Sequence, residues 1–185
     1  MSQPQSPSPA KLVVSVLMSN RTLESPVFLD LEQAFGAIDM IGPWMDFDYT
    51  DYYTPEMGKP LYRRMLAFTD LVAQSDLARI KLQTNEIELR YAQGGKRRMN
   101  IDPGYLLYER FVLATGKNYS HRIYIGQGIY ADLTLIYQKG AYRPLPWTYP
   151  DYADAAMADF LMKVRLKFGE DIKWPPKTDK TAHKE

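Results

Sequence analysis

Polar residues that could bind an anionic ligand are concentrated in the middle of the chain. Arg98, Asn100 and Asp102 alternate along a short segment, so in a β-strand their side chains would share one face. Arginine can donate two parallel hydrogen bonds to a phosphate or carboxylate group. Lys117 and Arg122 follow downstream and add two cations. The pattern predicts a pocket for a small anionic ligand, a nucleotide or phosphorylated metabolite, although a surface network of salt bridges would use the same residues.

His121 is the first candidate for acid–base chemistry, with Asp102 as a carboxylate partner. The chain has two histidines, and His121 is the one outside the C-terminal tail. Histidine exchanges protons readily near neutral pH. Because His121 alternates with Ile123 and Ile125 at the edge of an apolar face, the pattern favours a buried or half-buried structural role over a catalytic one. Whether the protein is an enzyme therefore stays open.

Several common chemistries are excluded by what the sequence lacks. There is no cysteine, which rules out disulfides, thiolate nucleophiles and cysteine-based zinc sites, and fits a reducing compartment. Gly-Lys pairs occur at 58–59, 95–96 and 116–117, but none has the flanking residues of a phosphate-binding P-loop. The Gly-x-Ser-x-Gly turn of many hydrolases is also missing. An ordinary GTPase or serine hydrolase is not expected.

Three aspartates are the candidates for holding a divalent metal ion. Asp46 and Asp48 are two residues apart and would share one face of a strand, with Asp51 close by. Such spacing is common in solvated loops, where aspartate caps turns. The pattern therefore assigns neither a metal nor a cofactor.

The overall charge gives little support to nucleic-acid binding. The chain has 23 lysines and arginines against 22 aspartates and glutamates, a formal net charge of +1. Proteins that bind nucleic acid through its phosphates present a positive surface. Tyr124 and Tyr130 could stack bases on a sheet face, but the sequence signature of RNA-binding sheets is absent. Nucleic-acid binding is the least favoured of the functions considered.

No segment has the length of a transmembrane helix. The longest apolar run, Leu12–Met18, is interrupted by Ser15 and is far shorter than the roughly 20 residues that cross a bilayer. The first ten residues lack the basic and apolar regions of a secretion signal. A soluble cytoplasmic protein without a membrane partner is expected.

The elements that must position these residues form one α+β domain over residues 11–172, with a disordered tail at 1–10 and a flexible tail at 173–185. Strands are predicted at 12–18, within 38–49, at 63–72 and 97–102, in the second half of 105–115, and as a hairpin over 121–138. Helices are predicted to begin at Ser25-Pro26, Ser75 and Asp154, and to end at Gly36, Gly94 and Gly169. This order predicts a mainly antiparallel sheet with helices packed on one face, specifically a ferredoxin-like core with added strands.

Two local features bear on where the polar side chains point, toward a pocket or toward solvent. Asp102-Pro103-Gly104 predicts a turn that ends its strand. On the second predicted helix, Lys81 and Asn85 lie beside the apolar stripe, where such side chains are usually solvated.

The hairpin is predicted to turn through a three-residue loop at 126–128. Its register places three pairs of residues opposite one another: Ile125 with Ile129, Tyr124 with Tyr130, and Arg122 with Asp132.

A proline-rich aromatic segment supports a second hypothesis, a module for protein interaction or assembly without chemistry. Pro144, Pro146 and Pro150 favour extended backbone, which would offer Trp147 and Tyr149 to a partner. The oligomeric state is left open.

Four stretches of sequence form a specific combination. They are Phe47–Tyr53 with Glu56–Gly58, Asn100–Tyr105, His121–Tyr124 with Gly128–Ala131, and Pro146–Tyr152. Together they resemble a bacterial family of uncharacterised proteins, domain-of-unknown-function family 4416, over roughly residues 11–168. The resemblance implies a stand-alone bacterial domain with no established activity. Some relatives carry a GTP-binding label, which the missing P-loop does not support here. The matching segments add Asp51 and Glu56 to the candidate ligand-binding residues.

Overall fold

The computed structural model describes residues 3–172, and the predicted flexible tail at 173–185 lies outside them. Residues 3–9 are exposed and form no helix or strand. The strands are β1 (Ala10–Met18), β2 (Ile38–Ile41), β3 (Met45–Asp46), β4 (Tyr62–Val72), β5 (Met99–Leu106), β6 (Arg110–Thr115), β7 (Arg122–Gly126), β8 (Ile129–Gln138) and β9 (Ala141–Pro144). The α-helices are α1 (Glu24–Phe35), α2 (Thr54–Met57), α3 (Leu77–Arg90) and α4 (Ala155–Asp171).

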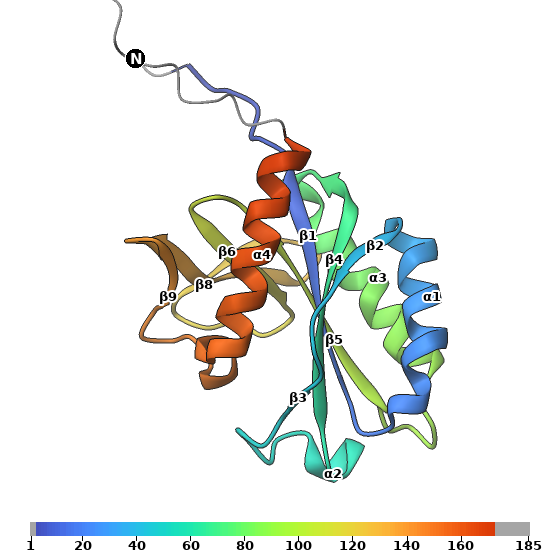
Figure 1. The fold of residues 1–185 in the computed structure, drawn as a ribbon. Coiled ribbons are helices and arrows are strands. Elements are labelled where there is room, and N and C mark those ends of the chain that lie inside the picture. The colour runs from blue at the N-terminus through green and yellow to red at the C-terminus, as the bar shows by residue number, and fades with distance from the viewer. Residues whose placement is uncertain (1–2, 173–185) are drawn as a thin grey trace, which may run out of the picture.

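In the described part of the chain, nine strands form one antiparallel sheet. The order is β2-β4-β1-β5-β6-β8-β7, with β3 paired to β4 and β9 to β8. Strand β4 lies between β1 and β2, and β1 lies between β4 and β5, so two β-α-β units are interleaved as in a ferredoxin-like core (Figure 1). The predicted class, a mainly antiparallel α+β sheet with helices packed on one face and strands added to a ferredoxin-like core, is confirmed: α1 and α3 share one face, and α4 packs with the added strands on the other.

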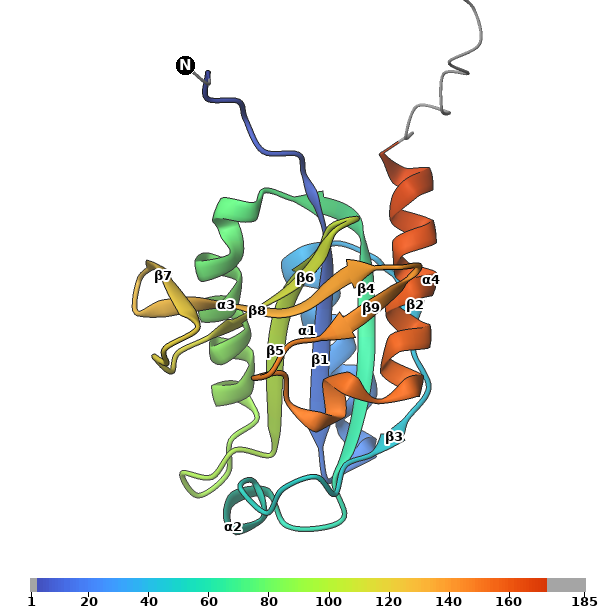
Figure 2. The same cartoon turned by 90° about the vertical axis from the view of Figure 1, so that its left-hand side faces the viewer.

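The central strand β1 is buried along its whole length, as its β-branched and apolar sequence predicts. Its even-numbered residues Leu12, Val14 and Val16 pack against α1 and α3. Val13, of the opposite parity, packs in the cluster that contains the inner face of α4. Figure 2 shows that β8 and β9 run across the direction of β1 and β4, so the added strands curl over the α4 side. Among residues 3–172, no helix combines the length and apolar character needed to cross a membrane.

The predicted turn at 102–104 is wrong, because β5 continues through it to Leu106. Pro103 is tolerated there because this part of β5 has no strand on its outer side, and β6 pairs only from Gly104 onward. A Cβ on Gly104 would lie 2.5 Å from the carbonyl oxygen of Val112. The glycine therefore allows the close approach of β6, rather than reversing the chain.

The predicted hairpin is confirmed except for its loop. Tyr124 pairs with Tyr130 and Arg122 with Asp132, but Gly126 pairs with Ile129 and Ile125 is bulged out. Gln127 and Gly128 both have positive φ, which suits the two-residue turn that matches strand twist. The extra residue is absorbed as a bulge.

Some predicted helix ends differ from the structure. Short 3₁₀ turns at Arg21–Leu23 and Gln74–Asp76 precede α1 and α3, so neither Ser25 nor Ser75 caps a helix. Helix α4 begins next to Asp154 as predicted, with Asp154 as its N-cap, and Gly36 ends α1 as predicted. Helix α3 ends at Arg90, before Gly94, and α4 continues past Gly169 to Asp171. At Gly169 a Cβ would lie 2.5 Å from the Tyr108 hydroxyl, so that glycine serves packing.

Gly104→Ala is expected to destabilise the protein by about 1–3 kcal/mol, because the clash is with backbone that cannot rotate away. Urea unfolding measures the change. Gly116→Ala is the matched control, since a Cβ there meets nothing within 4 Å. Equal stability of Gly104→Ala and the unchanged protein would show that β6 can shift to make room.

Candidate functional site

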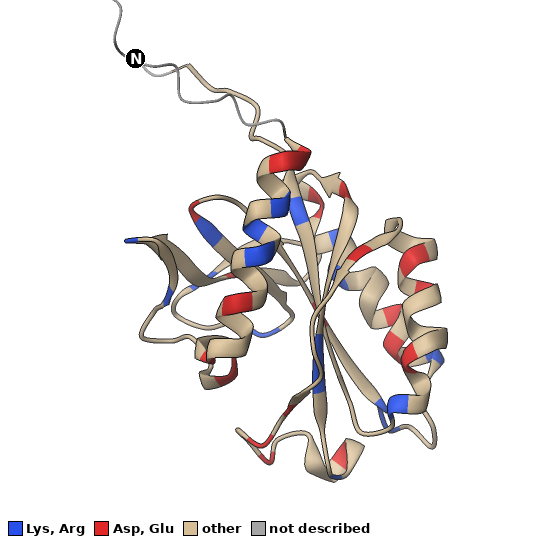
Figure 3. Cartoon of the chain, in the orientation of Figure 1, with Lys and Arg blue, Asp and Glu red and all other residues tan. Residues whose placement is uncertain are grey.

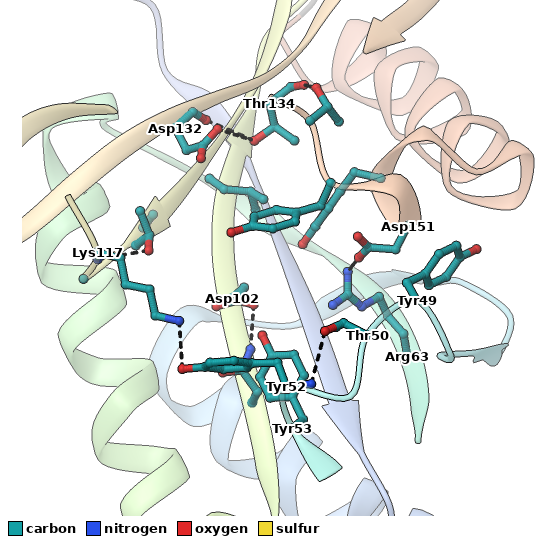
Figure 4. Close-up of a pocket in the computed structure, with 18 of the residues that line it drawn as sticks. Tyr49, Thr50, Tyr52, Tyr53, Arg63, Asp102, Lys117, Asp132, Thr134 and Asp151 are labelled. Atoms are coloured by element: carbon teal, nitrogen blue, oxygen red, sulfur yellow. Dashed lines mark hydrogen bonds and ion pairs between the residues drawn. The ribbon is translucent and has the colours of Figure 1, made fainter. Parts of the chain in front are cut away.

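A cavity of about 570 Å³ opens where β5 and β6 diverge. Its walls come from β4, β5, β6, β8 and α3, and it is covered by residues of the loop 47–53 and the segment 147–152. Figure 4 shows side chains from these distant parts of the sequence pointing toward one space. The volume lies within the range typical of small-molecule sites.

Side chains of α3 take the place of a missing strand along the outer edge of β5. The Ile101 carbonyl oxygen accepts a hydrogen bond from Lys81 Nζ at 2.7 Å, and the Ile101 N–H donates to Glu88 Oε1 at 2.7 Å. Buried backbone groups need such partners. Lys81 and Glu88 are both buried, so the prediction that Lys81 is solvated is wrong. Asn85 is half-buried and also lines the cavity.

Asp102 lies beside this edge, on the cavity face of β5. Its Oδ1 is 3.1 Å from Lys81 Nζ, and its Oδ2 accepts a 2.6 Å hydrogen bond from Asn100 Nδ2. Burial opposes ionisation of Asp102, but the charges of Lys81 and Arg63 and these hydrogen bonds outweigh it and lower its pKa. Asp102 is therefore an ionised acceptor in the cavity wall.

Arg97, rather than Arg98, belongs to the site. Arg97 lines the cavity, donates to Asn100 Oδ1 at 2.9 Å, and pairs with Glu56 at 2.8 Å. Hydrogen bonds from Arg97 lower the pKa of Glu56. Arg98 is half-buried and does not line the cavity. Arg98 falls outside the predicted alternation because β5 begins only at Met99.

A buried arginine forms another wall. Arg63 of β4 forms an ion pair with Asp151 and lies over the rings of Phe47 and Tyr152, at 4.7 and 5.1 Å from their centroids. Burial raises the pKa of the Tyr152 hydroxyl. These contacts tie β4 to the segment that leads into α4.

Asp132 of β8 gathers a third group of polar contacts. Arg122 Nε lies 2.9 Å and His121 Nε2 lies 3.3 Å from Asp132 Oδ2. The His121 ring stacks on Trp147 at 4.9 Å, and Trp147 donates to the Leu133 carbonyl at 2.8 Å. The carboxylate within reach of His121 is thus Asp132, not the predicted Asp102. His121 itself does not line the cavity.

The cavity mouth carries Lys117. Its ammonium donates to the Tyr52 hydroxyl at 2.8 Å, which joins the loop after β6 to the loop before α2 (Figure 4). Both side chains are exposed. On the same side, Arg122 donates to the Tyr149 hydroxyl at 3.4 Å.

The structure brings together part of the predicted site. Asn100, Asp102, Lys117 and Arg122 line the cavity, whereas His121 and Glu56 contact residues that line it. Asp51 is exposed and pairs with Lys59. Within residues 3–172, no three histidine, aspartate or glutamate side chains are placed to hold a metal ion, so Asp46, Asp48 and Asp51 do not converge.

Sequence reasoning missed several charged residues of the cavity. They are Arg63, Glu88, Arg97 and Asp151. Two of them could have been found from their spacing, because each lies on the same face of its element as a buried residue. Glu88 lies four residues after the buried Thr84 on α3, and Arg63 lies two residues before the buried Met65 on β4.

Comparison with known proteins gives a family but no activity. A family model described as "Domain of unknown function (DUF4416)" matches residues 8–168, most of the chain. No curated protein and no solved structure matches the sequence.

Lys81→Met is expected to lower the free energy of unfolding by about 3–5 kcal/mol, because it leaves Asp102 and the Ile101 carbonyl without their buried partner. Urea unfolding measures this loss. Lys163→Met, at an exposed position of α4, is the control and is expected to change stability little. A loss no larger than that of the control would mean that water replaces the Lys81 ammonium.

The stability difference between the unchanged protein and Lys81→Met is expected to shrink as the pH falls. The pKa of Asp102 is lowered in the fold, so ionised Asp102 contributes stability above its unfolded pKa of about 3.9, and this contribution is lost as the pH falls through the lowered value. Unfolding curves at pH 7 and pH 3 for both proteins test this. A difference that is independent of pH would contradict the assigned Lys81–Asp102 coupling.

Proposed function

Because this chain belongs to the DUF4416 family, a domain of unknown function, we propose its function from the cavity: it binds a small anionic ligand of the size of a nucleotide or phosphorylated metabolite. The predicted cytoplasmic location, which fits the absence of cysteine, is part of this proposal.

The observation that carries the proposal is the pairing of charges around the cavity. Four of its cations have carboxylate partners: Arg63 with Asp151, Lys81 with Asp102, Arg97 with Glu56 and Arg122 with Asp132. Lys117 contacts a neutral hydroxyl, and among the described residues no carboxylate lies within ion-pair distance of it. An anionic group of a ligand would supply the negative partner that the Lys117 ammonium lacks.

Aromatic rings in the cavity lining favour a ligand with an apolar or planar part. Tyr52, Trp147 and Tyr149 line the cavity and remain partly exposed. Such rings supply contact area at little cost in side-chain entropy. Acidic and basic residues are interspersed over the fold (Figure 3). The charges that select the ligand are therefore those around the cavity, and not a large surface region of one sign.

We assign His121 a positioning role rather than a catalytic one. Its ring is covered by Trp147 and its Nε2 faces Asp132, so it holds Trp147 at the cavity mouth. The predicted catalytic pairing of His121 with Asp102 forms no part of the proposal.

Lys117→Met is expected to weaken binding of phosphate-bearing ligands about 10- to 100-fold, since a charge-assisted hydrogen bond contributes about 1.5–3 kcal/mol. A thermal-shift screen over nucleotides, phosphorylated metabolites and divalent metals identifies a ligand, which at a hundredfold its Kd adds about 2.7 kcal/mol of stability. Isothermal titration then compares the variants.

Lys96→Met is the control, because Lys96 is an exposed loop lysine outside the cavity. If no phosphate-bearing compound shifts the melting temperature, the proposal is wrong. Equal weakening by both substitutions would point to a general charge effect.

Assembly is the second candidate function, favoured by a specific surface. Tyr119, Ile123 and Tyr124 are exposed, and β7 ends the strand order with one edge unpaired among the described residues. The predicted display of Trp147 is only partial, since its indole is docked on β8. If β7 mediates assembly, light scattering should show an oligomer that Ile123→Lys converts to monomer; a monomer at high concentration would dismiss this role.

A further inference from the structure

We infer that the ligand is a hydroxyl-bearing phosphate ester, whose phosphate lies near Lys117 and whose hydroxyl groups donate to Asp102. This inference rests on the proposed function and specifies the chemistry of the same site. The shared feature is a polyol attached to a phosphate, which a sugar phosphate and the ribose of a nucleotide both contain.

Asp102 is the carboxylate that a ligand in the cavity meets. Its side chain is 26% exposed, although protein surrounds it on several sides. The other three carboxylates of the lining are 6–9% exposed: Glu88, Asp132 and Asp151. Burial of those three against their cationic partners leaves little of their surface for a ligand.

The two oxygens of Asp102 retain acceptor capacity. Oδ1 accepts from Lys81 and Oδ2 accepts from Asn100. An ionised carboxylate offers about four lone-pair sites, so about two remain. Two neighbouring hydroxyl groups of a polyol can fill them, one on each oxygen.

The ligand group at Asp102 must donate hydrogen bonds and be neutral. The pKa of Asp102 is lowered, which keeps it ionised and able only to accept. A ligand ammonium would donate too, but it would approach Asp102 beside the Lys81 ammonium, which lies 3.1 Å from Oδ1. Like charges in a poorly hydrated site repel strongly, whereas a hydroxyl group avoids this repulsion.

Asn85 extends the surface that a polyol would contact. It lies one helical turn from Lys81 on α3 and also lines the cavity. Its amide can both donate and accept, which suits hydroxyl groups. The mouth, with Lys117 and the tyrosines, and the interior, with Asp102 and Asn85, thus differ in the groups that they recognise.

Calorimetric titration with matched compounds tests the inference on the unaltered protein. Ribose 5-phosphate is expected to bind at least tenfold more tightly than inorganic phosphate, and 2-deoxyribose 5-phosphate to lose much of that gain. AMP and 2′-deoxyAMP provide the same comparison for a nucleotide. Whichever of ribose 5-phosphate and AMP binds more tightly shows whether the site takes a sugar phosphate or a nucleotide. Glucosamine 6-phosphate is expected to bind more weakly than glucose 6-phosphate, because its ammonium would lie beside the Lys81 ammonium at Asp102.

Two variants locate the recognition. Asp102→Asn keeps the side-chain volume and is expected to bring the ribose-to-deoxyribose affinity ratio close to one. Asn85→Ala, at a half-buried position, is expected to reduce the same ratio without unfolding the protein, and it serves if Asp102→Asn does not fold.

The outcomes separate the two proposals. Absence of binding by every phosphate compound overturns the proposed function itself. If inorganic phosphate, ribose 5-phosphate and 2-deoxyribose 5-phosphate bind with equal affinity, the anion site at Lys117 is supported, but the role of Asp102 in binding hydroxyl groups is overturned. Tighter binding of the amino sugar than of glucose 6-phosphate also overturns it.

Discussion

The cavity depends on how one residue, Ile101, satisfies its backbone hydrogen bonds. Its N–H and carbonyl point away from β1, where β6 has already turned aside, and Glu88 and Lys81 of α3 bond to them. An unpaired strand edge inside a protein is costly, so the sheet can open here only because the helix supplies these partners. The same lysine then holds Asp102 ionised in the wall. Fold and candidate site therefore share one set of bonds.

Paired charges are the second condition for this interior. Arg63 with Asp151 and Arg122 with Asp132 each join a strand of the sheet to another segment of the wall. Ions removed from water need such partners, and a wall of complete pairs has little charge left to attract a ligand. Ligand selectivity therefore depends on two residues that can still contact a ligand: Lys117 at the mouth, which has no carboxylate partner among the described residues, and Asp102, whose carboxylate is partly exposed.

Spacing in the sequence identified faces, but it could not identify what each face meets. Asn100 and Asp102 share a face as alternation requires, and Arg122 pairs with Asp132. Lys81 and Arg63, in contrast, look like ordinary solvated charges in a one-dimensional pattern. A polar residue beside an apolar stripe is consistent with solvent, with a cavity or with a backbone edge. Only the position of β6 relative to α3 distinguishes these cases.

Hydrophobic periodicity by itself determined the strands of the core, the inner faces of α1, α3 and α4, and the β-α-β-β-α-β order along the chain, because burial of apolar surface is a property of each segment. The tertiary structure alone decided that β5 passes through Pro103 and Gly104, that Arg97 replaces Arg98, and that His121 faces Asp132 and Trp147. These outcomes depend on contacts between segments far apart in the chain. Their energies arise from distances that no local pattern encodes.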